Sequence, residues 1–254
     1  MKIKKEINVM LRSKKKFLDY KQNLKVVILC GGLGSRLAEE TKKIPKPMVN
    51  IGKFPILIHI MNIYMKYGFR EFILALGYKK EVIIKYFKSK KFKKISIKLV
   101  DTGKKTLTGT RVLKLKKYLN GENFLLTYGD GLSDINLDEL LKFHLKNNKI
   151  ATITAVRPPA RFGELFIKNN FVKRFEEKNQ VKSGWINGGF FVFNKKIFEF
   201  IPKKLCMLEK QPMNNLTKKN KLIAYKHKFF WQCMDTIRDK EILNKIWRSG
   251  KSKW

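Results

Sequence analysis

The chain alternates between short apolar runs and longer amphipathic segments, and this pattern predicts strands that alternate with helices. Buried strands are predicted at residues 25–30, 71–76, 95–100, 124–128, 151–156, 189–193 and 222–226. Helices are predicted at residues 55–66, 81–87, 110–119, 137–145, 195–200 and 236–249. Such alternation is typical of α/β proteins, in which helices cover both faces of the sheet. We therefore expect a Rossmann-like, three-layer α/β fold with a mixed, mainly parallel sheet.

Two segments depart from this rhythm. Residues 163–167 and 171–175 alternate in hydrophobicity on either side of Asn169-Asn170, which predicts a β-hairpin. Residues 1–24 carry eight Lys or Arg residues against two acidic ones and show weak periodicity. We expect them to form a basic N-terminal extension outside the core, with one frayed helix at most. No repeat or low-complexity linker divides residues 25–254, so these are predicted to form one domain.

The composition sets the broad class of the protein. The chain has 254 residues, of which 44% are hydrophobic, enough to bury a core. No run approaches the roughly 20 apolar residues of a membrane span, and the charged N-terminus lacks the apolar block of a secretory signal. We therefore expect a cytoplasmic protein. The three cysteines, Cys30, Cys206 and Cys233, form no CxxC pair, which argues against a zinc site and a disulfide framework.

The net charge of +37 raises the question of a nucleic-acid partner. The basic residues are spread along the whole chain, and they comprise 48 lysines and 9 arginines. Specific recognition of bases and phosphates favours the planar fork of arginine. We therefore expect no specific nucleic-acid partner, although weak binding at low salt would be natural for such a surface. Small anionic substrates would also be attracted to it.

The first predicted strand ends at a glycine-rich loop, Gly31-Gly32-Leu33-Gly34, where open α/β sheets bind ligands. No lysine follows the last glycine, which excludes a P-loop, and Leu37 stands where a dinucleotide fingerprint needs a third glycine. The remaining interpretation is a phosphate cradle that adds two cations, Arg36 and Lys46. A plain turn would not need three glycines and Arg36.

Two aspartates are candidate ligands of a magnesium ion, which would neutralise phosphate charge. Asp130 follows a predicted strand and lies between Gly129 and Gly131, which leave room around its carboxylate. Asp235 precedes the last predicted helix, so the residues alone also allow a simple N-cap role for it.

The pattern GGLGSR followed by PKPM resembles the signature of sugar-1-phosphate nucleotidyltransferases. Further matching segments follow in order: VDTG at 100–103, TGTR at 108–111, TYGDG at 127–131, RFG at 161–163, FEEK at 175–178, INGGFFVF at 186–193 and WQCMDT at 231–236. Several of them are similar to the cytidylyltransferase branch in particular. The resemblance extends from Lys25 to Trp254, and the series is specific although each motif alone is weak.

This resemblance implies transfer of a cytidylyl group from CTP to α-D-glucose 1-phosphate, with release of pyrophosphate and with Mg²⁺ as cofactor. It implies catalytic roles for Arg36, Lys46 and Asp130, and metal ligation by Asp130 and Asp235. The implied nucleotide-binding residues are Leu29, Cys30, Gly31, Gly32, Leu33, Gly34, Ser35, Arg36, Lys46, Thr106, Arg111 and Gly129. The implied sugar-phosphate residues are Gly163, Glu177, Lys178 and Asn187. A homo-oligomer is also expected.

The chain departs from the family pattern at a few places. The segment before Val100 is shorter, Asn179 replaces a proline, and Gln211 replaces an acidic residue. The last two changes lie on the sugar side, so another base or sugar phosphate, as in UTP or dTTP enzymes, stays an alternative. Two further alternatives are a non-catalytic nucleic-acid-binding protein and a regulatory subunit without turnover. The retained Arg36, Lys46, Asp130 and Asp235 argue against the regulatory subunit.

Overall fold

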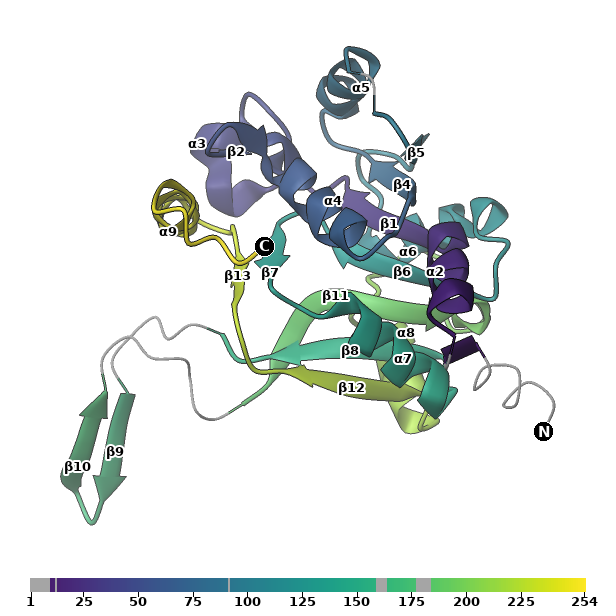
Figure 1. Cartoon of the computed structure of the whole chain (residues 1–254). Coiled ribbons are helices and arrows are strands. Elements are labelled where there is room, and N and C mark those ends of the chain that lie inside the picture. Colours follow the sequence, from purple (N-terminus) through teal and green to yellow (C-terminus); the bar gives the residue numbers. More distant parts are fainter. Residues whose placement is uncertain (1–9, 12, 91, 159–163, 177–183) are drawn as a thin grey trace.

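A seven-stranded sheet forms the centre of the computed structural model, which describes residues 10–11, 13–90, 92–158, 164–176 and 184–254 (Figure 1). The strand order is β12-β8-β11-β6-β1-β4-β5. The strands are β1 Lys25–Cys30, β4 Glu71–Leu76, β5 Ser96–Asp101, β6 Asn123–Tyr128, β8 Ala151–Val156, β11 Ile186–Asn194 and β12 Leu222–His227. β11 runs antiparallel to β6 and β8, whereas the other neighbouring pairs are parallel. The predicted mixed, mainly parallel sheet is confirmed.

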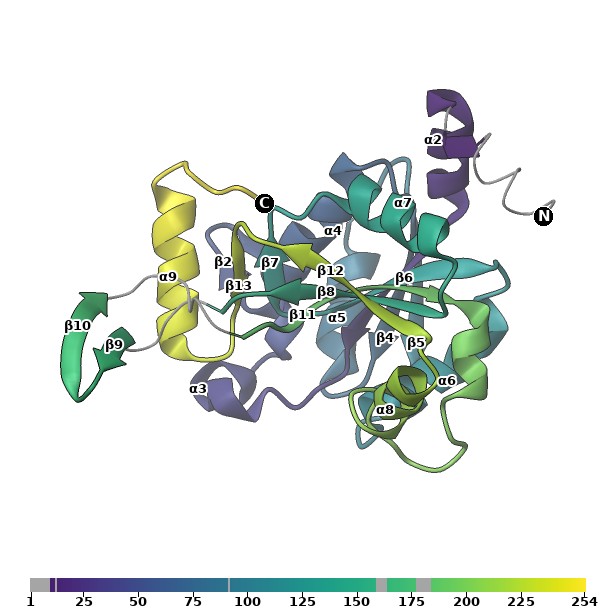
Figure 2. The ribbon, with the colours of Figure 1, turned by 90° about the horizontal axis from the view of Figure 1, so that it is seen from below.

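Helices cover both faces of this sheet, as the three-layer expectation requires. They are α2 Lys14–Asn23, α3 Ala38–Thr41, α4 Ile56–Lys66, α5 Lys80–Lys88, α6 Thr108–Lys114, α7 Leu137–Asn147, α8 Gln211–Lys218 and α9 Ile237–Arg248. The views in Figures 1 and 2 place α4 and α7 on one face, and α6 and α8 on the other. Alternation along β1 serves both layers, because Val26 and Ile28 belong to one core and Val27 to the other.

Short elements complete the fold. They are β2 Asn50–Ile51 with β3 Phe54–Pro55, β7 Gly131–Ser133 with β13 Trp231–Cys233, β9 Glu164–Lys168 with β10 Phe171–Glu176, and the 3₁₀ helices η1 Ser35–Leu37, η2 Lys46–Met48, η3 Lys116–Tyr118 and η4 Lys195–Glu199. The predicted hairpin is confirmed as β9–β10, and its turn residues Asn169 and Asn170 have positive φ angles of 49° and 63°. Gly163, where that hairpin was expected to begin, lies outside the described residues. β7, β13 and α8 were not predicted.

Two predicted helices differ from the structure. The helix expected at residues 110–119 ends at Lys114, where a bond from the Leu115 N–H to the Val112 carbonyl tightens the last turn into η3. In place of the helix expected at residues 195–200 lies the 3₁₀ helix η4, Lys195–Glu199. A segment this short between a strand and a loop makes i→i+3 bonds, such as the bond from the Phe200 N–H to the Ile197 carbonyl.

The N-terminal helix α2 packs on the domain. Phe17 is only 6% exposed and lies in the same core as Leu24, at 5%. The Lys21 ammonium contacts the Asp138 carboxylate of α7 at 2.7 Å. The expectation that residues 1–24 stay outside the core is therefore wrong for this helix, because Phe17 and the alkyl stem of Lys21 give it one buried face. No helix in the described ranges is long and apolar enough to cross a membrane.

Candidate active site

A cavity of about 900 Å³ opens where β1 and β6 end. Its lining contains most of the predicted site residues: Leu29, Gly31, Gly32, Leu33, Gly34, Ser35, Arg36, Lys46, Thr106, Arg111, Gly129, Asp130, Asn187 and Asp235. Cys30 is fully buried in the core instead, and burial raises the pKa of its thiol. Gly163, Glu177 and Lys178 lie outside the described residues.

The loop after β1 has unpaired backbone donors. Within the described residues, nothing accepts a hydrogen bond from the N–H groups of Gly32, Leu33 and Gly34. Gly34 has a φ angle of +67°, and its carbonyl accepts a 3.0 Å bond from the Thr41 hydroxyl, which fixes the end of the loop. Consecutive free N–H groups in such a turn form a cradle for an anion.

The buried side chain of Arg111 supports this loop through hydrogen bonds. Its guanidinium donates to the carbonyls of Leu76 at 2.8 Å, Gly31 at 3.1 Å and Thr106 at 2.7 Å, and to the Thr102 hydroxyl. Burial lowers the pKa of Arg111 from its usual value. No carboxylate among the described residues contacts the guanidinium, so its positive charge adds to the attraction of the loop for anions.

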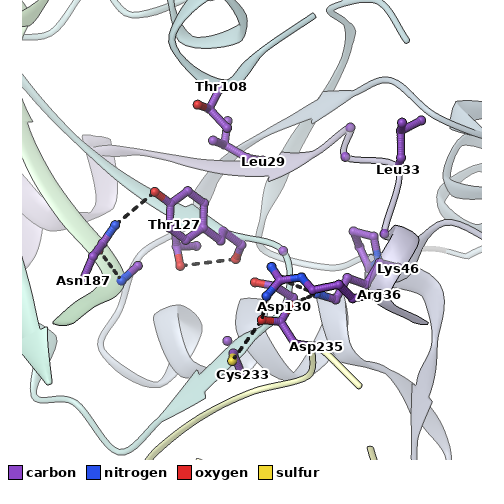
Figure 3. Close-up of a pocket in the computed structure, with 18 of the residues that line it drawn as sticks. Leu29, Leu33, Arg36, Lys46, Thr108, Thr127, Asp130, Asn187, Cys233 and Asp235 are labelled. Carbon is purple, nitrogen blue, oxygen red and sulfur yellow. Dashed lines mark hydrogen bonds and ion pairs between the residues drawn. The ribbon is translucent and has the colours of Figure 1, made fainter. Parts of the chain in front are cut away.

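Four charged groups converge beside the loop (Figure 3). The Lys46 Nζ lies 2.7 Å from Oδ2 of Asp130 and 2.5 Å from Oδ1 of Asp235. Arg36 lies 2.6 Å from the other carboxylate oxygen of Asp235. Desolvation opposes the charged form of Lys46, but the two aspartates outweigh it and raise the pKa of its ammonium. Two cations thus balance two carboxylates at this point.

A short antiparallel ribbon brings the two aspartates together. Cys233 of β13 pairs with Gly131 of β7, and the Met234 N–H donates to the Asp130 carbonyl at 2.8 Å. The N-cap of α9 is Thr236, in a capping box with Asp239, so Asp235 is not the N-cap. Its side chain is free to face Lys46 and Arg36.

The aspartates suit a hard divalent cation. Carboxylate oxygens from both converge within 2.7 Å of one point, the Lys46 nitrogen, and oxygen is the ligand that Mg²⁺ prefers. Among the described residues there is no group of three or more His, Cys, Asp or Glu side chains that could hold a metal. Two carboxylates, completed by phosphate oxygens, are the usual protein share of a magnesium site in phosphoryl chemistry.

The sequence reasoning missed several lining residues, although they lie in the motifs it singled out. Tyr128 belongs to TYGDG, Thr108 to TGTR and Trp231 to WQCMDT. On the opposite side of the cavity from Arg36, Asn187 bonds to the Tyr128 hydroxyl at 3.1 Å (Figure 3). The motif resemblance could have included these positions, but their contacts depend on long-range packing.

Comparisons with known proteins identify the family of the chain. Glucose-1-phosphate cytidylyltransferase of Salmonella typhimurium is 41% identical over 253 residues, which cover 91% of this chain and 98% of that protein. The crystal structure of HddC from Yersinia pseudotuberculosis matches with a TM-score of 0.70 at 26% identity, covering 88% of this chain and 99% of that one. A UDP-glucose pyrophosphorylase in complex with UDP-glucose shares the fold, with a TM-score of 0.71 at 17% identity and coverages of 89% and 99%. The nucleotidyl transferase family matches residues 25–238, and the chain belongs to this family.

Proposed function

We propose that the protein transfers a cytidylyl group from CTP to α-D-glucose 1-phosphate. A phosphate oxygen of the sugar phosphate forms a bond to the α-phosphorus of CTP, the bond from that phosphorus to the bridging oxygen breaks, and pyrophosphate leaves. The observation that carries the proposal is the Lys46 ammonium between Asp130 and Asp235, beside a loop of unpaired N–H groups. This arrangement combines anion binding with the carboxylate pair that a metal-assisted phosphoryl-type transfer needs.

The residues of the chain have separate tasks in this proposal. The N–H groups of residues 32–34 bind the phosphates of the nucleotide, and Arg111 holds the loop in shape. Arg36 and Lys46 neutralise charge that grows on the leaving pyrophosphate. Asp130 and Asp235 hold Mg²⁺, which supplies Lewis-acid stabilisation of the phosphate oxygens when it is bound. No covalent nucleophile is required, because positioning and cations supply most of the catalysis.

The choice of substrates is supported by the relatives. The Salmonella typhimurium protein, which is named as a glucose-1-phosphate cytidylyltransferase, aligns with nearly the whole chain. We assign the nucleotide to the loop side of the cavity, which includes Leu29, Ser35, Thr106 and Gly129. The sugar phosphate is assigned to the side of Asn187, with Gly163, Glu177 and Lys178 as proposed partners. We further propose that the protein assembles as a homo-oligomer, which light scattering of the purified protein would test.

A pyrophosphate-release assay tests the function directly. The purified protein is given each of CTP, UTP, dTTP and GTP with a set of sugar 1-phosphates, in the presence of Mg²⁺. We expect release with CTP and glucose 1-phosphate. Strong release with UTP or dTTP and none with CTP would overturn the cytidylyl assignment. Tight binding of duplex DNA at physiological salt without any release would favour the nucleic-acid alternative.

A further inference from the structure

The carboxylate of Glu209 links two residues that line the cavity. Glu209 lies in the loop before α8 and is not itself part of the cavity lining. Its Oε1 accepts a 2.5 Å bond from the Tyr128 hydroxyl at the end of β6, and its Oε2 accepts a 2.6 Å bond from the Thr108 hydroxyl at the start of α6. Tyr128 and Thr108 both line the cavity, and they come from different elements, the end of β6 and the start of α6.

The bond to Glu209 fixes how the Tyr128 hydroxyl is used. Burial and the neighbouring Glu209 carboxylate both raise the pKa of Tyr128, so the hydroxyl keeps its proton at neutral pH. That one proton goes to Glu209, and the hydroxyl oxygen is left as an acceptor. It accepts a 3.1 Å bond from the Nδ2 of Asn187. The ring of Tyr128 is held in place by an edge contact with Phe191, whose ring centre is 5.7 Å away.

The orientation of the Asn187 amide follows from these contacts. Its Oδ1 accepts a 2.8 Å bond from the Gly189 N–H, and one hydrogen of its Nδ2 goes to Tyr128. The second Nδ2 hydrogen has no acceptor among the described residues, and the exposed side chain faces the cavity. The amide thus presents a donor, which suits an oxygen of a sugar hydroxyl or of a phosphate.

Glu209 also holds Thr108. The Thr108 hydroxyl donates to Glu209 and accepts a 2.9 Å bond from the Leu208 N–H. One residue further along, the Gly109 N–H donates to the Cys206 carbonyl. The loop that carries Glu209 is therefore docked on the start of α6, next to Thr106 on the nucleotide side of the cavity.

We propose that Glu209 is a positioning residue that directs the free donor of Asn187 toward the sugar phosphate through Tyr128 and holds Thr108 on the nucleotide wall. This inference rests on the proposed function for the identity of the two substrates. Glu209 touches neither substrate, so it acts by binding geometry and not by chemistry.

Steady-state kinetics of Glu209→Gln test the proposal. An amide offers one acceptor where the carboxylate offers two, so one of the two links is lost while the shape is kept. We expect the KM for the sugar phosphate to rise about tenfold, the cost of one well-placed hydrogen bond, with kcat within about twofold of wild type. Tyr128→Phe should raise the same KM. The KM of the double variant should not exceed that of the more impaired single variant. Thr108→Val should raise the KM for CTP instead.

Controls separate positioning from folding. Glu199→Gln removes an exposed carboxylate of η4 and should leave both KM values unchanged. A folding defect in Glu209→Gln would reduce the active fraction and lower kcat while KM stayed at the wild-type value, and that outcome would overturn the proposal. Wild-type KM values in Glu209→Gln, or additive effects in the double variant, would overturn it as well.

One measurement does not depend on catalysis. In protein labelled with ¹³Cζ-tyrosine, the Tyr128 resonance is assigned by its loss in Tyr128→Phe. It should shift in Glu209→Gln and stay in place in Glu199→Gln, because only the first change removes the acceptor of its hydroxyl. An unchanged Tyr128 resonance would overturn the network even if the kinetics agreed. If the wild-type protein released no pyrophosphate, the proposed function would fail while this spectroscopic result remained informative.

Discussion

The Nζ of Lys46 lies 2.5 Å from Oδ1 of Asp235, although 189 residues separate the two in the sequence. The same nitrogen lies 2.7 Å from Oδ2 of Asp130. One ammonium group thus occupies the point at which the oxygens of both aspartates converge. Because Lys46 and the proposed Mg²⁺ would draw on the same oxygens, the lysine and the metal ion would compete for the site until phosphates engaged the lysine.

In Lys46→Met, no ammonium would compete with Mg²⁺ for the two aspartates. The stability of this variant should therefore depend on Mg²⁺. Without the ammonium, Asp130 loses its ion-pair partner beside Asp235, which keeps Arg36, and we expect this to cost about 3 kcal/mol of unfolding free energy. Thermal unfolding with and without millimolar Mg²⁺ measures the effect. Mg²⁺ should raise the Tm of Lys46→Met clearly more than that of wild type or of Lys42→Met, an exposed lysine. An equal rise of Tm with Mg²⁺ in all three proteins would contradict the idea that Lys46 and Mg²⁺ use the same position between the aspartates.

Asp130→Asn should abolish turnover and leave the fold intact. The amide keeps the volume but loses the charge that we propose holds the metal, so kcat should fall on the order of a hundredfold or more. Pyrophosphate release gives the rate, and circular dichroism checks the fold. The exposed Asp19→Asn on α2 serves as the matched control. Near-normal turnover of Asp130→Asn would rule out its role as a metal ligand.

The neighbouring glycines Gly31 and Gly32 should respond differently to alanine. A Cβ at Gly31 would lie 2.0 Å from the Arg111 guanidinium, whereas a Cβ at Gly32 would meet nothing within 4 Å. Gly31→Ala should therefore displace Arg111, lower the unfolding free energy by about 1–3 kcal/mol and raise the KM for CTP. Gly32→Ala should keep the wild-type Tm. Urea unfolding and CTP kinetics compare the two variants. Equal unfolding free energies and equal KM values would show that Arg111 does not fix the conformation of the loop.

His144 should make the protein less stable in mild acid. Burial lowers its pKa from the usual 6.5 to about 4. The folded state then binds fewer protons than the unfolded state, so this contribution to stability is full above pH 6.5 and is lost as the pH falls to about 4, by about 3 kcal/mol in total. Urea unfolding at pH 7.5 and pH 5 should show a smaller loss for His144→Gln than for wild type. The same loss in both would assign the acid sensitivity to other groups.

Phe17→Ala tests the contribution of the N-terminal helix. Phe17 is 6% exposed in the core, whereas its neighbour Leu18 is 41% exposed. We expect Phe17→Ala to lower the unfolding free energy by about 3 kcal/mol and Leu18→Ala by far less. Chemical denaturation of both variants measures the difference. A negligible effect at Phe17 would restore the picture of a peripheral extension.

The accuracy of the sequence predictions depended on the length of each element. β1, β4 and β8 match their predicted ranges, because a buried six-residue strand that is mostly apolar has a strong signal of its own. The three-residue strands β7 and β13 were missed, since they contain too few positions to show a period and are defined by pairing across the chain. These missed strands are the ones that bring Asp130 and Asp235 together.

For the site residues too, local sequence motifs were informative and long-range contacts were not. The motifs placed Arg36, Lys46, Asp130 and Asp235 at the cavity before any geometry was known, and the structure brings them together. Their binding roles stay predictions. The motif around Arg111 suggested a direct nucleotide contact, but its guanidinium donates to four groups of the protein. Glu209 gave no signal in the sequence analysis, because its partners Thr108 and Tyr128 are 101 and 81 residues away.

The order in which a ribosome makes the chain gives the β7–β13 ribbon a further consequence. Lys46 and Asp130 are synthesised before β8, β11 and β12, whereas Asp235 follows only after β13 has been synthesised. A chain that stops before β13 therefore contains the seven strands of the sheet but only one of the two aspartates. Under the proposed function, a chain that ends before Asp235 would therefore lack activity however much of its sheet had formed.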